Sequence, residues 1–160
     1  MTKAIVVSAL VVFVLSHLSP PCVANDREIG RILAAAESHF QAMERMLYPA
    51  IWGLLTERSK NTIIREVQKN SNGVYTEEQI ATDLTMGGII ARSYWHGFLD
   101  TFEPEMVLEE SRWEMGKIKG HKAEIIITYS KNAGRPAILR MYKEDDRWKV
   151  GLVETFWSRR

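Results

Sequence analysis

Residues 142–150, YKEDDRWKV, contain the most informative pattern in the chain. Aspartate favours turns, so a tight turn at Asp145-Asp146 joins a β-rich segment at 136–143 to another at 147–157. Apolar side chains of the two segments then fall on one face, which supports a hairpin in this register. The facing pairs are Met141 with Val150, Leu139 with Leu152, and Ala137 with Glu154. We expect this hairpin to close an antiparallel sheet.

Two more β-rich segments precede the hairpin, at 107–117 and 122–130. Lys119-Gly120 forms a turn between these two segments, and the turn residues 131–134 separate the second of them from the hairpin. Four strands joined by short turns predict a four-stranded antiparallel meander.

The chain before residue 106 has a helical pattern. Apolar residues recur about every 3.6 positions from Ile29 to Leu47, which predicts a helix with one buried face, capped by Asn25 or Asp26. Tyr48-Pro49 interrupts it, because proline disfavours helical geometry at the preceding residue. The apolar positions are Ile29, Ile32, Leu33, Ala36, Phe40, Met43 and Leu47.

A short helical piece around Trp52 follows the interruption. Ser59 is placed to cap a further helix, which the turn residues 70–73 end.

Thr76 and Gln79 have the spacing of a capping box at the start of the next helix. That helix bends or breaks at Gly87-Gly88 and continues to Phe102. Helices in the first part of the chain and strands in the second predict an α+β domain, with N-terminal helices packed on one face of the sheet. No linker or repeat interrupts residues 25–160, so we expect a single domain.

The first 24 residues have the pattern of a secretory signal. Met1-Thr2-Lys3 is a short basic start, residues 4–15 are apolar apart from one serine, and small residues precede Asn25. We expect cleavage after Ala24 and an exported domain that is periplasmic or extracellular. The apolar run is about 12 residues long, whereas a membrane-spanning helix needs roughly 20. An uncleaved anchor and a lipoprotein with a lipidated Cys22 are the alternatives.

Composition narrows the class of protein. The chain has 160 residues with 21 basic and 20 acidic groups, and this balanced charge argues against a nucleic-acid binder. Its hydrophobic fraction of 46% argues against disorder. Signal cleavage removes Lys3 and the single cysteine, which leaves 20 basic and 20 acidic groups. The mature domain then has no disulfide, no cysteine nucleophile and no thiolate zinc site. Its core alone must hold the fold.

The stretch at 142–150 resembles the closing hairpin of the nuclear transport factor 2-like superfamily, which includes SnoaL-like and ketosteroid isomerase-like proteins. In those proteins a strand, an acidic or glycine turn and a Trp-Lys-Val or Trp-Lys-Ile run often end the chain. The order of elements over about 26–157 is similar as well. One departure is that family members commonly insert a strand between the second and third helical pieces, and none can be placed here.

The resemblance implies a curved four-stranded sheet wrapped around helices, as a cystatin- or nuclear transport factor 2-like cone with an internal pocket. It does not imply one function, because the superfamily includes isomerases, dehydratases, cyclases and non-catalytic binding modules.

His96 and Asp100 are four residues apart on a predicted helix and therefore share a face. A carboxylate that holds an imidazole in one tautomer is a typical arrangement for a general base, although such pairs are also common surface contacts. We expect no metal site, because His39, His96 and His121 lie far apart and outside zinc-binding spacings. No cofactor is expected either, since Gly87-Gly88 lacks the sequence context of a phosphate-binding loop.

Glu154 falls on the inward face of the last predicted strand, together with Trp148 and Leu152. A carboxylate there needs a hydrogen-bonding or cationic partner, or it takes up a proton. Two roles fit: a pocket acid that orients a ligand, and a structural residue at the rim of the cone or in an internal ion pair. If the protein is an enzyme, His96, Asp100 and Glu154 are the candidate acid–base residues.

All five tryptophans and all five tyrosines follow residue 24. Such side chains either fill the space between helices and sheet, or line a pocket for a flat or apolar ligand whose orientation their N–H and O–H groups fix. The candidate ligand-binding residues are Trp52, Tyr94, Trp95, Trp113, Trp148 and Glu154.

Two functions therefore fit the sequence. The first is an exported, non-catalytic binding or accessory protein. Its partner would be a small apolar or aromatic ligand, or an envelope protein or second copy that contacts the outer face of the sheet. The second is a small-molecule isomerase or dehydratase with a histidine or carboxylate as acid or base in the cone. Neither nucleic acid nor, after signal cleavage, a membrane is an expected partner.

Overall fold

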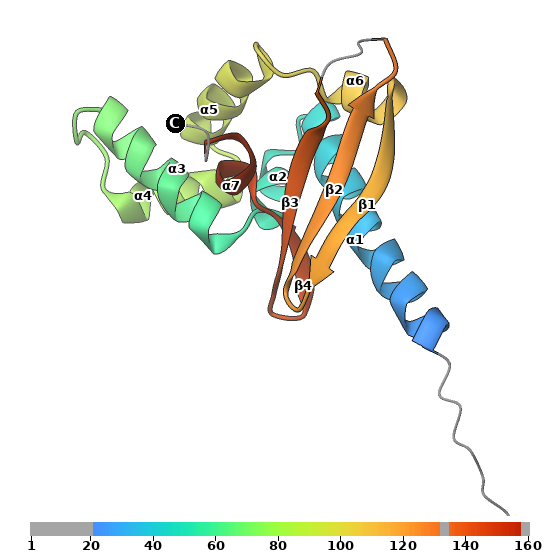
Figure 1. The fold of residues 1–160 in the computed structure, drawn as a ribbon. Helices are drawn as coiled ribbons and strands as arrows, with labels where there is room; N and C mark the ends of the chain where they lie inside the picture. The colour runs from blue at the N-terminus through green and yellow to red at the C-terminus, as the bar shows by residue number, and fades with distance from the viewer. Residues whose placement is uncertain (1–20, 132–134, 158–160) are drawn as a thin grey trace, which may run out of the picture.

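A computed structural model describes residues 21–131 and 135–157. Four strands form one open antiparallel sheet in the order β1-β2-β3-β4, and helices precede and flank it (Figure 1). This arrangement confirms the predicted α+β class with a four-stranded antiparallel sheet. The strands are β1 (Ser111–Lys119), β2 (Lys122–Tyr129), β3 (Ala137–Glu144) and β4 (Arg147–Val150).

The closing hairpin turns at Asp145 and Asp146, as predicted. Their φ angles are 48° and 57°, and two consecutive residues with positive φ make a two-residue loop whose twist matches that of the flanking strands. Met141 pairs with Val150, which confirms the predicted register at this position.

The chain leaves the sheet after Val150. A short helix, α7 (Leu152–Phe156), takes the place of the predicted end of the strand. Residues 152–154 are all buried, a pattern that a strand with one inward face does not show. Two predicted pairs are therefore wrong, Leu139 with Leu152 and Ala137 with Glu154.

Gly151 makes this change of direction possible. A Cβ atom at this position would lie 2.7 Å from Cε2 of Tyr142, so only glycine fits against the ring without displacing it. The Gly151 N–H donates to the Arg140 carbonyl at 2.8 Å, and the Arg140 N–H donates to Thr155 Oγ1 at 3.0 Å. Helix α7 thus satisfies the edge of β3 that β4 leaves open.

The predicted strand at 107–117 is wrong over its first residues. Pro104–Glu109 form helix α6, which starts with proline in its first turn, and β1 begins at Ser111. Val107 is buried and Glu109 is exposed. In a strand these two residues would share a face, so the difference in their burial fits a helical turn and not the predicted strand.

The first helix, α1 (Pro21–Glu44), begins before the predicted caps. Neither Asn25 nor Asp26 is its N-cap in the full-length chain, because both lie inside the helix. Leu47 is outside α1 and serves as the N-cap of α2 (Tyr48–Gly53), which has proline in its first turn.

The predicted signal falls largely on residues 1–20, outside the described residues. Among the helices of 21–131 and 135–157, none is long and apolar enough to cross a membrane.

Helix α3 (Glu57–Asn70) is capped by Thr56, not by Ser59 as predicted. Thr56 has the extended backbone of an N-cap, and its Oγ1 accepts from the Ser59 N–H at 3.1 Å. Its own N–H donates to the carbonyl of Val150 at 3.0 Å, so pairing with β4 keeps Thr56 extended.

Helix α4 (Glu77–Met86) starts with the predicted capping box. The Gln79 N–H donates to Thr76 Oγ1 at 3.2 Å, and the Thr76 N–H donates to Gln79 Oε1 at 2.9 Å. The next helix, α5 (Ile89–Leu99), ends three residues before the predicted end at Phe102.

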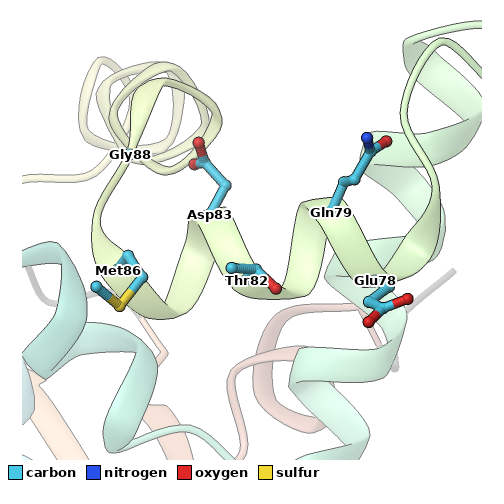
Figure 2. A pocket seen from close by; sticks show the side chains of 6 residues that line it. All are labelled: Glu78, Gln79, Thr82, Asp83, Met86 and Gly88. Atoms are coloured by element: carbon cyan, nitrogen blue, oxygen red, sulfur yellow. The ribbon is translucent and has the colours of Figure 1, made fainter.

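The predicted break between α4 and α5 lies at Gly87-Gly88. Gly87 has a φ of 72°, which glycine adopts without strain. The carboxylate of Asp83 points from α4 toward the start of α5, where Oδ1 accepts from the Ala91 N–H at 2.9 Å (Figure 2). A Cβ atom at Gly88 would clash with this carboxylate, so glycine lets Asp83 cap the neighbouring helix.

Helices α1 and α6 pack on the sheet, whereas α3, α4 and α5 lie to one side of it and do not cover its face as predicted (Figure 1). Helix α1 packs against β4 and α6, and α2, α4 and α5 pack against one another beside it. Inward-facing strand residues such as Ile125 and Met141 are fully buried, whereas their neighbours Glu124 and Arg140 reach solvent.

Charged residues tie the start of α1 to the closing hairpin. Glu28 Oε1 accepts from Lys143 Nζ at 3.0 Å and from Trp148 Nε1 at 2.9 Å. Arg31 pairs with Glu28 at 3.1 Å and donates to the Asp146 carbonyl at 2.6 Å. The hydrogen bonds from Lys143 and Trp148 hold the pKa of Glu28 below its ordinary value. The Glu28 carboxylate therefore stays ionised, and accepts charge-assisted hydrogen bonds, to a lower pH than an ordinary glutamate does.

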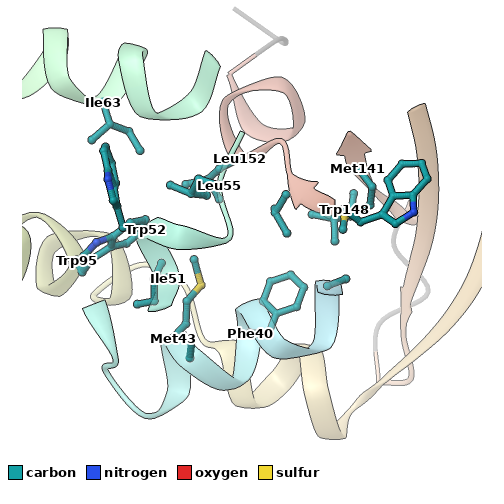
Figure 3. Packing of buried hydrophobic residues seen from close by; sticks show 14 of the residues in the cluster. Phe40, Met43, Ile51, Trp52, Leu55, Ile63, Trp95, Met141, Trp148 and Leu152 are labelled. Atoms are coloured by element: carbon teal, nitrogen blue, oxygen red, sulfur yellow. The ribbon is translucent and has the colours of Figure 1, made fainter. Parts of the chain in front are cut away.

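One continuous hydrophobic core joins the helices to the sheet (Figure 3). It extends from Trp95, Trp52 and Ile63 in the helical layer, through Phe40 of α1, to Trp148 on the sheet. A cooperative core of this kind accounts for stability in a domain without disulfides.

His39 of α1 is the unusual member of the interior. Its side chain is fully buried, and within the described part of the chain neither ring nitrogen has a hydrogen-bond partner. It packs edge-on against Phe40, with ring centroids 5.7 Å apart. Burial lowers the pKa of His39 to about 3, so the imidazole is neutral in the folded protein at neutral pH.

His39 makes the protein sensitive to acid. Below its unfolded-state pKa of about 6.5, the unfolded chain binds a proton that the folded protein rejects, so this residue costs about 1.4 kcal/mol of stability per pH unit down to about pH 3. We expect the free energy of unfolding to fall more between pH 7 and about pH 4.5 in the wild type than in His39→Leu, by ~2–3 kcal/mol. Urea denaturation at the two pH values measures the difference.

His121→Gln is the matched control, because His121 is exposed in the β1–β2 turn. This variant should retain the wild-type pH dependence. Equal losses in the wild type and in His39→Leu would contradict the assignment of acid sensitivity to His39.

Candidate functional site

The predicted ligand-binding tryptophans lie mostly in the core (Figure 3). Trp95 is fully buried, and Trp52 and Trp148 are about 5% and 4% exposed. Half-buried Trp113 packs edge-on against Phe40, with ring centroids 5.6 Å apart, and its Nε1 donates to Ser111 Oγ at 2.8 Å. Trp52 and Trp95 fill the helical layer, whereas Trp113 and Trp148 pack between α1 and the sheet.

Tyr94 is the predicted aromatic residue that reaches a surface pocket. The pocket has a volume of about 350 Å³ and lies where α3 and the α3–α4 connection meet the first turns of α5. We call it the α3–α5 pocket. Apolar and aromatic walls come from Val67, Tyr75, Ile89, Ile90 and Tyr94. Asn70, Ser71 and Ser93 add polar groups.

The α3–α5 pocket contains no Asp, Glu, His, Lys or Arg among its lining residues. Burial, with a smaller effect from the negative charge of Glu66, raises the pKa of Tyr94 well above its ordinary value. The phenol is therefore neutral at all ordinary pH values. This arrangement suits an uncharged, apolar or aromatic group and offers no base for proton transfer.

His96 lies on the exposed side of α5, and its hydrogen-bond partner is Tyr48. His96 Nε2 and the Tyr48 hydroxyl oxygen are 2.7 Å apart, and the two rings meet edge-on. Asp100 is exposed at the C-cap of α5. The predicted His96–Asp100 pair is thus replaced by an imidazole–phenol pair at the surface.

Glu154 is buried, as predicted, but on α7 and not on a strand. Its side chain is 4% exposed and faces the start of α3. Ser59 Oγ donates to Oε2 at 2.8 Å, and Thr56 Oγ1 donates to Oε1 at 3.1 Å. The Val153 N–H donates in turn to Ser59 Oγ at 3.2 Å.

This network joins α7 to the N-terminus of α3. Ser59 uses its hydroxyl proton for the carboxylate and its lone pairs for the Val153 N–H, so the serine links two elements that are far apart in the sequence. Glu154 thus has a structural role: the hydroxyl donors at this helix junction compensate the cost of burying its carboxylate.

Two surface features were not anticipated from the sequence. One is a depression along α4, lined by Glu78, Gln79, Thr82, Asp83, Met86 and Gly88 (Figure 2). Met86 and Ile89, on either side of the Gly87-Gly88 break, are 74% and 81% exposed. The other is a groove with acidic residues near α6. The acidic run at 103–110 is the sequence signal for it, but only the tertiary structure shows the apolar floor.

Comparison of the chain with protein-family models, curated protein sequences and solved structures finds no match. The described residues also include no group of three or more His, Cys, Asp or Glu side chains placed to hold a metal ion.

Glu154 yields a stability prediction. We expect Glu154→Ala to lower the free energy of unfolding by about 2–3 kcal/mol, because the hydroxyls of Thr56 and Ser59 lose a buried acceptor. Urea denaturation at neutral pH measures the change.

Glu66→Ala on the exposed side of α3 is the control and should change stability by no more than about 0.5 kcal/mol. If the two variants proved equally stable, the network would not hold α7, and a ligand-directed role for Glu154 would gain weight.

Proposed function

We propose that this protein is an exported, non-catalytic binding protein that receives an uncharged apolar or aromatic group in the α3–α5 pocket. The observation that carries the proposal is the pocket's lining, which combines two tyrosines and aliphatic side chains with a few neutral polar groups. A volume of about 350 Å³ suits a ring system or one large side chain of a partner protein.

The groups available for catalysis support a binding role. Glu154 is engaged with hydroxyl donors inside a helix junction, and Tyr94 is held neutral by burial. Glu154 does not line the pocket and Tyr94 stays protonated, so neither gives the pocket a general base. The exposed Ile89 at the pocket's rim extends the apolar surface toward Met86. An envelope protein or a second copy therefore fits the helical layer better than the outer face of the sheet, where Glu124 and Arg140 face each other across strands.

Export rests on residues 1–24, with their basic start, short apolar run and small residues before Asn25. The hairpin's resemblance to the nuclear transport factor 2-like superfamily is compatible with a binding module, because that superfamily includes many.

A second candidate is an isomerase- or dehydratase-type enzyme. The pair formed by Tyr48 and His96 favours it, since an imidazole 2.7 Å from a phenol can relay a proton. Neither residue lines the α3–α5 pocket, so this pair has no substrate site there. The enzyme therefore ranks below the binding protein.

Export predicts a defined mature N-terminus. When the full-length chain is expressed in a bacterial host that secretes through the general pathway, we expect the mature protein to begin at Asn25. Intact-mass measurement of envelope and culture fractions checks this. A chain that keeps residues 1–24 and stays in the membrane fraction would establish the anchor alternative.

The α3–α5 pocket predicts binding of a neutral aromatic probe. N-phenyl-1-naphthylamine should bind the mature protein saturably and gain fluorescence, because it leaves water for an apolar site. Ser93→Trp should weaken this binding at least about tenfold, or ~1.4 kcal/mol, since the new ring occupies the pocket.

Thr85→Trp is the matched control: Thr85 is exposed on α4 and lies outside the pocket. It should bind the probe like the wild type. Absent binding, or equal binding by Ser93→Trp, would refute a pocket-based function. Native mass spectrometry of the purified mature protein would then identify any molecule retained in the wild type and lost from Ser93→Trp.

A further inference from the structure

A groove runs between the end of α1 and the segment that connects α5 to α6. It consists of two adjoining depressions of about 280 and 240 Å³, which share Glu103 and Glu105. We call it the acidic groove. Its apolar residues are Met43, Met46, Leu99, Phe102, Pro104 and Met106. Its acidic residues are Glu44, Glu103, Glu105, Glu109 and Glu110.

The apolar part of the acidic groove is rich in methionine. Met46 is 53% exposed and Met106 is 37% exposed, so both present thioether side chains to solvent. Methionine is unbranched and polarisable, and therefore adapts its shape to different apolar partners. Phe102 forms a firm base, because it stacks on buried Phe40 with ring centroids 5.9 Å apart.

The acidic part carries a local excess of negative charge. Residues 103–110 contain four glutamates and no lysine or arginine, in a chain whose net charge is only +1. Glu110 pairs with Lys131 at 2.5 Å. The other four carboxylates of the groove have no lysine, arginine or histidine within ion-pair distance among the described residues. Arg45 follows Glu44 in the chain but lines neither depression.

We propose that the acidic groove binds a cationic amphipathic helix from a partner protein. The helix would place leucine-like side chains on the methionines and Phe102, and its lysines or arginines against the carboxylates on the groove's sides. An apolar, methionine-containing groove that accepts a helix by its i, i+3 and i+4 side chains is an established mode of peptide recognition. The unpaired carboxylates supply the charge complementarity that selects a basic helix over an acidic one.

The length of the groove fits a helix better than a compact cation. The second depression follows α6, whose six residues span about 9 Å at 1.5 Å per residue. That length corresponds to between one and two turns of a bound helix lying along α6. A small cation would neutralise one or two carboxylates and leave the methionine surface uncovered.

This site is distinct from the α3–α5 pocket and goes beyond the function proposed for it. The two sets of lining residues have no member in common. A failure of helix binding would therefore leave the result with the aromatic probe unchanged, and the reverse also holds.

A designed peptide tests the proposal on the mature domain, residues 25–160. The probe is a labelled peptide of about 14 residues made of leucine and lysine, with leucine at helical i, i+3, i+4 and i+7 positions. We expect saturable binding by fluorescence anisotropy, a gain of helical circular dichroism on mixing, and weaker binding as salt rises. Glu103→Gln/Glu105→Gln should weaken binding at least about tenfold at low salt and reduce its salt dependence.

Matched controls separate the groove from general charge attraction. Glu66→Gln/Glu78→Gln removes the same charge from exposed sites on α3 and α4, and should bind like the wild type. Met46→Lys should weaken binding as well, while leaving the circular dichroism of the free protein unchanged. A scrambled peptide of the same composition should bind at least about tenfold more weakly.

Three results would overturn the proposal. The first is no binding of the amphipathic peptide. The second is an equal loss in both double variants, or equal binding of the scrambled peptide, since either would show unspecific attraction. The third is competition by a small lipophilic cation such as tetrabutylammonium at concentrations no higher than those of the peptide, which would identify a small-molecule site.

Discussion

The junction of the two layers depends on the backbone of Val150. On one side Val150 pairs with Met141 of β3. On the other, its N–H donates to the Leu54 carbonyl at 2.8 Å, and its carbonyl accepts from the Thr56 N–H at 3.0 Å. The chain between α2 and α3 therefore lies against β4 as a short additional strand would, and β4 has no open edge there. Because Val150 is fully buried, loss of these bonds would leave backbone polar groups without water or a partner.

That constraint also distributes the aromatic side chains. With α2 and α3 held close to the sheet, Trp52, Trp95 and Trp148 are needed to fill the interior, and none remains at an accessible surface. Tyr94 sits farther out, on the side of α5 that faces α3, and so reaches the pocket. Glu154 is explained by the same junction, since α7 follows directly from β4 and brings the carboxylate onto the start of α3.

Features decided by neighbouring residues were predictable from sequence, and features decided by distant contacts were not. The two-aspartate turn and the capping box at Thr76 depend on a few adjacent positions, and both were predicted. The end of β4 was not, because Gly151 turns the chain only where it meets Tyr142 of another strand. Thr56 and Ser59 were equally good caps by residue type, and pairing with β4 selected Thr56. The pocket and the acidic groove combine side chains from separate elements, for which no local pattern exists.

The hydrogen bond between Glu28 and Trp148 joins residues 120 positions apart, so the beginning of α1 is fixed by nearly the last part of the domain. Helix α1 cannot reach its final place before the closing hairpin has been synthesised. Long-range contacts of this kind slow folding, because a large loop must close before they form. The export proposed above would benefit from such a delay, because a chain passes through a narrow secretion channel unfolded. The contacts of Glu28 near the start of α1 thus form only after the closing hairpin is present.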